Sequence, residues 1–144
     1  MPAPRHDTDA NKGIVRSFIE AWNNRDFARF EDLMADTCQL AVGADRVSSS
    51  PSSTREIAEY WVAAFPDWRF ELLDLVAEGD RVVALMPYSG TQDGDVLDIP
   101  ATRRRVQVSE IVIFRIADGR IAEAWEVYDE CGMRRQLGGM PASV

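Results

Sequence analysis

The apolar residues of this chain change their spacing at Pro66, and this change limits the folds open to it. Before Pro66 they recur at the three- and four-residue spacing of helices. After it they form β-branched and aromatic runs separated by glycine-containing turns, which is typical of strands. Helices followed by strands predict an α+β fold, in which helices cover one side of an antiparallel sheet. A length of 144 residues fits one such domain with a full core.

Three helices are expected. The first spans about residues 9–24, and a short second helix begins near Asp26 as N-cap. The third opens at residues 53–56, which have the S/T-x-x-E form of a capping box, and Pro66 ends it. The serine-rich residues 48–53 are expected to form a loop. Strands are expected at about residues 39–42, 70–77, 81–91, 105–116 and 120–128.

Charge and histidine content exclude several classes of function. His6 is the sole histidine, and it lies in a polar segment, residues 1–10, that we expect to be a disordered tail before a single domain at 11–140. Without a usable imidazole in the folded domain there is no Ser-His-Asp apparatus and no histidine-based zinc site. A net charge of −8 argues against nucleic acid and anionic membranes as partners. The two distant cysteines are expected to be reduced in the cytoplasm, because no secretion signal or membrane span is visible.

The last hairpin, from Val106 to Glu130, predicts two candidate catalytic residues. A two-residue turn at Asp118-Gly119 would place Ile111 opposite Glu126. A three-residue loop at residues 117–119 would instead place Glu110 opposite Glu126. We favour the second register, because it collects one apolar face with two small alanines and two glutamates. Its members are Val106, Val108, Glu110, Val112, Phe114, Ala122, Ala124, Glu126 and Tyr128.

When two carboxyl groups lie this close together on an apolar wall, ionising both of them is unfavourable, so the pKa of one should rise. One proton held between two acids is a general acid/base arrangement. The alternative is structural: either glutamate could be an exposed strand charge, or could pair with an arginine. The candidate partners are Arg69, Arg81 and Arg115.

Several segments, in order, resemble the SnoaL-like polyketide cyclases of the NTF2-like superfamily. They are FIEAWNNRD at 18–26, AFPDWRFELLDLVAEGDRVV at 64–83, the G-T and P-A-T-x-R-R elements around 90–105, and IFRIADGRIAEAWEVYDECGMRRQLG at 113–138. The resemblance covers nearly the whole chain after about residue 10. It implies a cone-shaped barrel, in which a curved antiparallel sheet wraps around N-terminal helices and encloses a deep apolar pocket. It also implies a homodimer and no metal or organic cofactor.

In the aromatic polyketide cyclases of this family a pocket carboxylate acts as acid/base in an intramolecular aldol closure. The resemblance places that aspartate at Glu126 of this chain. The family's pocket glutamine falls at Glu110, its histidine at Val112, and its early-strand asparagine near Gln39. The acid/base set has therefore shifted toward glutamates.

Other residues have both a functional and a structural interpretation. Asp129 could be a third pocket carboxylate, a cap in the C-terminal loop or a member of a salt bridge. Tyr88 and Tyr128 could donate to a substrate carbonyl or simply pack. Trp22, Trp61 and Phe65 could line the helix side of the pocket or belong to the core, as could Val112 and Phe114 on the sheet side. Trp125 is expected to point away from Glu126.

Three further features have mainly structural interpretations. Cys38 and Cys131 are expected to be structural. The run Arg103-Arg104-Arg105 is a solvated loop or a contact for an acidic group.

The sequence thus predicts a cofactor-independent cyclase of polyketide-type natural-product biosynthesis, such as antibiotic biosynthesis. It would bind a largely apolar intermediate and close a ring by aldol-type or cycloaddition-type chemistry. Glu126, Glu110 and Asp129 are the candidate catalytic residues. One alternative is an epoxide hydrolase or ether-ring-forming enzyme of the same fold, and another is a non-catalytic ligand-binding module.

Overall fold

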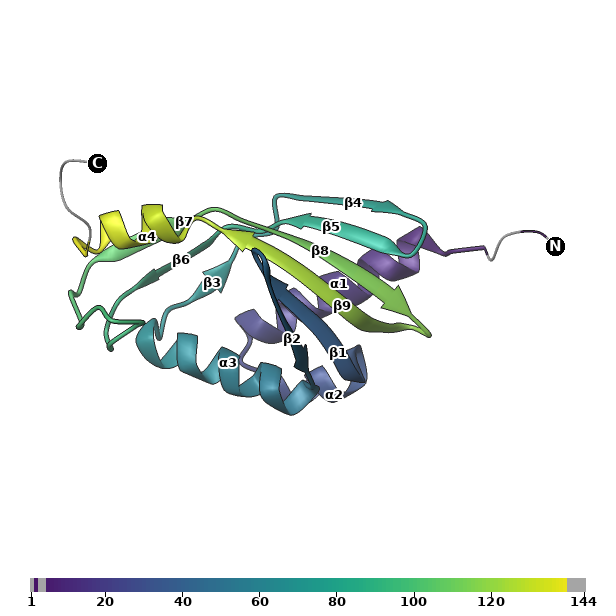
Figure 1. Cartoon of the computed structure of the whole chain (residues 1–144), viewed down its shortest axis with the longest axis horizontal. Helices are drawn as coiled ribbons and strands as arrows, with labels where there is room; N and C mark the ends of the chain where they lie inside the picture. Colours follow the sequence, from purple (N-terminus) through teal and green to yellow (C-terminus); the bar gives the residue numbers. More distant parts are fainter. Residues whose placement is uncertain (1, 3–4, 140–144) are drawn as a thin grey trace.

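The computed structural model describes residue 2 and residues 5–139 of the chain. The helices, including one 3₁₀ turn η1, are α1 (Thr8–Asn23), η1 (Phe27–Arg29), α2 (Phe30–Leu33), α3 (Pro51–Ala64) and α4 (Glu130–Gln136). The strands are β1 (Met34–Val42), β2 (Asp45–Ser49), β3 (Arg69–Phe70), β4 (Asp74–Glu78), β5 (Arg81–Leu85), β6 (Tyr88–Thr91), β7 (Arg105–Val108), β8 (Glu110–Ala117) and β9 (Arg120–Tyr128). Figure 1 shows this arrangement. The α+β prediction is confirmed.

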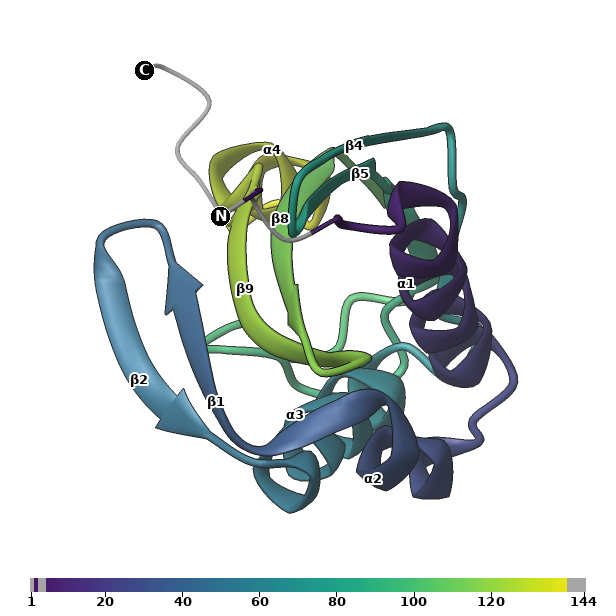
Figure 2. The ribbon, with the colours of Figure 1, turned by 90° about the vertical axis from the view of Figure 1, so that its right-hand side faces the viewer.

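The strands form two sheets. Six of them pair in the order β2-β1-β9-β8-β5-β4, and the other three in the order β3-β6-β7. The larger sheet curves, and α1, α2 and α3 lie on the side toward which it curves (Figure 2). Two details of the prediction are wrong. The pairing of β1 with β9 is parallel, so the sheet is mixed, and β2 and β4 remain as free edges, so the barrel is not closed.

Helix α1 begins within the segment predicted to be a tail. The Asp7 side chain accepts a hydrogen bond from the backbone N–H of Ala10 and so caps the helix, which starts at Thr8. Residues 1, 3 and 4 of that predicted tail lie outside the described residues. One face of α1 is buried, as its spacing predicts, through Val15, Phe18, Ile19, Ala21 and Trp22.

The serine-rich segment is not the loop that its composition predicts. Strand β2 runs to Ser49, Ser50 is the N-cap of α3, and Pro51 occupies the first turn. Ser50 accepts a hydrogen bond from the N–H of Ser53 at 3.1 Å. Proline fits the first turn because its missing N–H has no partner there in any helix. The helix therefore starts three residues before the position that the predicted capping box implied.

The hairpin of β8 and β9 corrects the predicted register. Asp118 and Gly119 have φ of 53° and 74°, so the turn has two residues, in the conformation that Asp-Gly favours. Ala117 therefore pairs with Arg120. Ala122 has no partner, and this β-bulge shifts the rest of β9 by one residue. The shift brings Ile121 rather than Ala122 to the buried face, yet leaves Glu110 and Glu126 on the same face.

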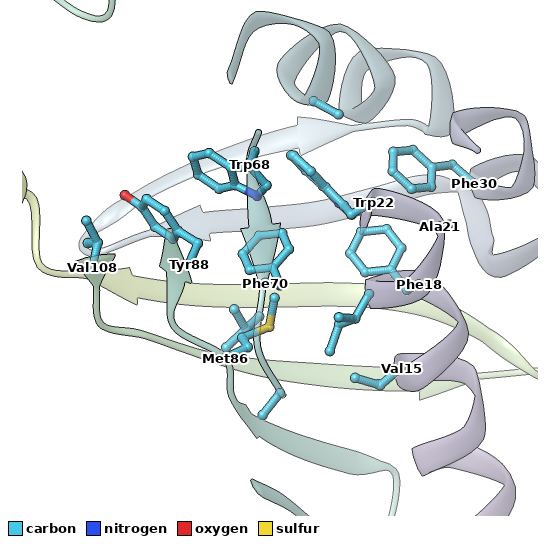
Figure 3. Close-up of a cluster of buried hydrophobic side chains, with 14 of the residues drawn as sticks. Val15, Phe18, Ala21, Trp22, Phe30, Trp68, Phe70, Met86, Tyr88 and Val108 are labelled. Atoms are coloured by element: carbon cyan, nitrogen blue, oxygen red, sulfur yellow. The ribbon is translucent and has the colours of Figure 1, made fainter. Parts of the chain in front are cut away.

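An aromatic cluster fills the space between the helices and the sheets. Figure 3 shows Phe18, Trp22 and Phe30 from the helical layer facing Trp68, Phe70 and Tyr88. Trp68 stacks on Tyr88 with a centroid distance of 4.0 Å, and Trp22 meets Phe70 edge-on at 5.4 Å. Within the described part of the chain, no helix has both the length and the apolar character needed to span a bilayer.

Replacing the capping serine tests where α3 begins. We expect Ser50→Ala to lower the free energy of unfolding by about 1 kcal/mol, because it removes the acceptor for an N-terminal N–H. Ser53→Ala is the matched control and should cost clearly less, since Ser53 already lies inside the helix. Urea denaturation measures both values. A larger loss for Ser53→Ala would place the cap at Ser53 instead.

Candidate functional site

Glu110 and Glu126 lie on the inward face of the β8–β9 hairpin. Glu110 pairs with Tyr128, and Glu126 pairs with Val112, so the two glutamates are diagonal neighbours rather than directly opposed. Long side chains can bridge this diagonal spacing. The two carboxyl groups are joined by a hydrogen bond. The structure thus brings the predicted pair together by a register that the sequence analysis did not choose.

Burial determines how the pair holds its proton. Glu110 is 6% exposed, and burial, followed by repulsion from Glu126, raises its pKa well above the ordinary value near 4.5. Burial also raises the pKa of Glu126, but the hydrogen bond from Glu110 acts in the opposite direction there. Burial therefore favours a single proton held between the two carboxyl groups. The pair holds one acid and one base in direct contact.

Neither glutamate has the structural role that was the alternative. No ion pair among the described residues includes Glu110 or Glu126. Arg115 pairs with Glu123 on the opposite face of the sheet, and Arg69 and Arg81 are exposed.

Two chambers meet at the carboxyl pair. The first has a volume of about 70 Å³ and a mainly apolar wall, formed by residues that include Phe18, Met34, Leu40, Met86, Val112, Phe114, Ile121 and Ala124. The second has a volume of about 60 Å³ and a mainly aromatic wall, formed by Trp61, Trp68, Tyr88 and Tyr128 in addition to the shared residues. Both are lined by Trp22, Ile57, Phe70, Glu110 and Glu126. The acid/base pair thus faces both chambers.

The two tyrosines of the second chamber are neutral donors that are already engaged. The Tyr128 hydroxyl donates to Glu130 at 2.8 Å, and the Tyr88 hydroxyl lies 3.6 Å from the sulfur of Met133. Burial raises the pKa of both phenols. Glu130 is in turn held by Arg134 at 3.2 Å. Tyr128 can therefore accept a hydrogen bond from a group in the chamber while it donates to Glu130.

Most of the predicted binding residues line a chamber. Trp22 lines both, Val112 and Phe114 line the first, and Trp61, Tyr88 and Tyr128 line the second. Gln39 is an exposed residue of β1 at the rim of the first chamber. Trp125 points outward, as predicted, and its indole N–H donates to the carbonyl of Gly43.

Two predicted residues do not line either chamber. Phe65 is fully buried and stacks against Trp61, so it supports the wall from behind. Asp129 is exposed, and its carboxylate accepts the N–H of Gly132 at 2.8 Å as the N-cap of α4. This is the capping role that the sequence analysis left open, because a carboxylate before a helix satisfies the free N–H groups of its first turn.

Several lining residues were not predicted. Ile57 reaches the chambers from α3, and Met86 from the segment after β5. Trp68 reaches them from the turn before β3, and Phe70 from β3 itself. Their apolar character marked them as core, and nothing in the sequence separates a core position from a chamber wall. Trp68 also has a buried indole N–H that finds no acceptor among the described residues.

Cys38 and the arginine run keep structural roles. Cys38 lines the first chamber, but its thiol contacts the carbonyl oxygens of Ala35 and Ile121, and burial raises its pKa, so it is a poor nucleophile. In the arginine run, Arg103 pairs with Asp93 and Arg105 lies 3.9 Å from Asp67. The run lines neither chamber.

Titration of the pair should make stability fall as pH rises. Above about pH 4.5 the folded protein keeps a proton on Glu110 that the unfolded chain releases, so the free energy of unfolding decreases up to the folded-state pKa. We expect Glu110→Gln to flatten this decrease above about pH 4.5. The exposed Glu78→Gln is the control and should keep the wild-type slope. Equal slopes in wild type and Glu110→Gln would show that Glu110 ionises normally.

Known proteins share this fold. TsrD from Streptomyces laurentii is 33% identical, with a TM-score of 0.85 over 94% of this chain and 100% of TsrD. A SnoaL-like polyketide cyclase from Agrobacterium tumefaciens is 26% identical, with a TM-score of 0.76 over 89% of this chain and 98% of the other. AclR from Streptomyces galilaeus, a candidate hydroxylase, is 24% identical, with a TM-score of 0.85 over 94% of this chain and 89% of AclR. This similarity shows that the two proteins share a fold.

A search of curated protein sequences finds no match to the chain. The profile of the SnoaL-like polyketide cyclases matches residues 12–137. Together with the shared fold, this match shows that the chain belongs to the SnoaL-like polyketide cyclase family, with the NTF2-like fold.

Proposed function

We propose that this protein closes a ring on a largely apolar polyketide-type intermediate, with Glu126 as the base and Glu110 as the acid. The observation that carries the proposal is the buried carboxyl pair that shares one proton between two chambers. Family membership supports the class of reaction. Lyase- or isomerase-type ring closure in antibiotic-like natural-product biosynthesis is part of the same proposal.

An aldol closure uses both members of the pair. The Glu126 carboxylate removes a proton from the carbon beside one carbonyl group, and the resulting enolate carbon attacks a second carbonyl of the same molecule. As the carbon–carbon bond forms, the attacked carbonyl oxygen becomes an alkoxide and takes the proton of Glu110. One proton shift from Glu126 to Glu110, along their hydrogen bond, then restores the starting state.

The chemistry of this closure sets its requirements. No electrons are gained or lost overall, so we propose that the reaction needs no cofactor. The chambers contribute by holding two ends of one flexible molecule together, which alone can be worth several kcal/mol. We place the protein in the cytoplasm, in keeping with the free thiols of Cys38 and Cys131.

Substitution of Glu126 tests the acid/base assignment. With the apolar diketone 1-phenylhexane-1,5-dione as probe, we expect Glu126→Gln to lower kcat for ring closure by about 10²–10⁴-fold, because the base is lost. Glu123→Gln is the matched control: it lies on the same strand, paired with Arg115 on the other face, and should keep the wild-type rate. A folded Glu126→Gln variant with wild-type kcat would overturn the assignment.

The outer face of the large sheet supports the expected homodimer. Val76, Val83, Ile113 and Trp125 form one row across four strands, and Leu85, Ile111 and Val127 form the next. Most of these side chains are exposed, Val127 by 61% and Val76 by 58%. A continuous apolar face of this kind marks an interaction surface. We assign it to a second copy of the chain.

A charge in the middle of this face tests the dimer. We expect Ile113→Asp to convert a dimer into a folded monomer in sedimentation velocity, because the buried charge would lack a partner. Val47→Asp on the edge strand β2 introduces the same charge elsewhere and should leave the dimer intact. Dimers that survive Ile113→Asp would contradict this interface.

A further inference from the structure

A groove on the surface continues the buried chambers. It has a volume of about 590 Å³ and lies between β2 and α3, where Val47, Ile57, Tyr60, Trp61 and Leu97 form most of its wall. Ile57 lines the groove and both chambers, Ser49 joins the groove to the first chamber, and Trp61 joins it to the second. The groove therefore begins where the chambers open. Figure 2 shows the end of β2 beside the start of α3.

The groove is apolar although it faces solvent. Val47 is 52% exposed, Tyr60 45% and Leu97 41%. Its other residues are serines and a single charged side chain, Glu56. Apolar side chains gathered in this way next to a pocket are typical of a surface that a ligand covers.

The position of Leu97 is not explained by packing in the core. Its φ of 53° lies in the left-handed region, which is unfavourable for a leucine. The backbone N–H of Leu97 donates to the Tyr60 hydroxyl at 2.7 Å, which ties the loop before β7 to α3. An unfavourable backbone conformation is thus maintained at a residue whose side chain extends the groove into solvent.

The chambers are too small to hold a ring-closing molecule by themselves. A cavity of about 150 Å³ is the size that takes up one benzene ring, whereas the chambers measure about 70 Å³ and 60 Å³. A molecule that folds back to form a ring must therefore extend beyond them. The adjoining groove is the apolar surface into which it can continue.

We propose that the groove binds the uncharged, apolar tail of the same substrate whose oxygenated end lies between Glu110 and Glu126. This inference rests on the proposed function, and it identifies the substrate class as elongated molecules with a carbonyl-bearing head and an apolar tail. Glu56 disfavours an anionic tail at this surface.

Binding of two alkylphenols tests the proposal without catalysis. The phenol hydroxyl of 4-methylphenol or 4-hexylphenol can donate a hydrogen bond to the carboxyl pair while the ring extends from the chambers toward the groove. Only the hexyl chain is long enough to continue along the groove. Calorimetry should show that each methylene in the groove raises the affinity by about threefold. In the double variant Val47→Thr/Leu97→Asn, threonine keeps a β-branched side chain in strand β2, and asparagine is a residue that tolerates positive φ at position 97. It should reduce the hexyl-to-methyl affinity ratio about tenfold and leave 4-methylphenol binding unchanged.

The matched control places the same kinds of substitution outside the groove, the chambers and the proposed dimer face. Val42→Thr/Leu73→Asn changes two apolar residues, 36% and 55% exposed, that line neither the groove nor a chamber, and should keep the wild-type ratio. An unchanged ratio in the groove variant would overturn the proposal. So would dissociation of a dimer by the groove variant, with no effect of tail length, because the groove would then be an interface between copies. Wild-type ring closure by Glu126→Gln would contradict the proposed function but leave the tail-length result standing.

Discussion

Desolvation of two carboxyl groups is the constraint on which the interior of this protein depends. A single carboxylate in an apolar wall is unfavourable by several kcal/mol, and two adjacent ones repel each other as well. Glu110 and Glu126 avoid most of this penalty by sharing a proton through their hydrogen bond. The same apolar surroundings that make ionisation unfavourable keep one acid and one base ready at a pH where free glutamates would both be charged.

The curved sheet and the aromatic cluster provide these surroundings. Trp22 from α1, Ile57 from α3 and Phe70 from β3 converge on the pair, although they lie far apart along the chain. Behind them, Phe65 holds Trp61 in position, and Tyr88 stacks on Trp68. A wall of interlocked rings moves little, so the chambers can orient a flexible ligand against the carboxyl pair.

The sequence predicted the elements well, and its errors have physical causes. The helical spacing located α1 to within one residue at each end, because tertiary burial and helix periodicity agree there. Serine-rich composition concealed the start of α3, where Ser50 and Pro51 are a cap and a first-turn residue rather than a loop. In the last hairpin the favoured three-residue loop was wrong, because the turn has only the two residues Asp118 and Gly119. The bulge at Ala122 has no sequence signature and shifts the strand beyond it, so the register of the two-residue alternative fails there as well. The parallel pairing of β1 with β9 joins segments about 80 residues apart and could not be predicted from local pattern.

Local periodicity and side-chain chemistry, both readable from the sequence, determined the α+β class, the position of Glu110 and Glu126 on one inward face, and the outward direction of Trp125. Side chains alternate along a strand, so the face of a residue is a local property. Tertiary structure alone decided that Asp129 caps α4 while Phe65 stays behind the wall, and that Ile57 and Trp68 line the chambers. It also decided the pKa of each glutamate, because desolvation depends on residues brought together from the whole chain.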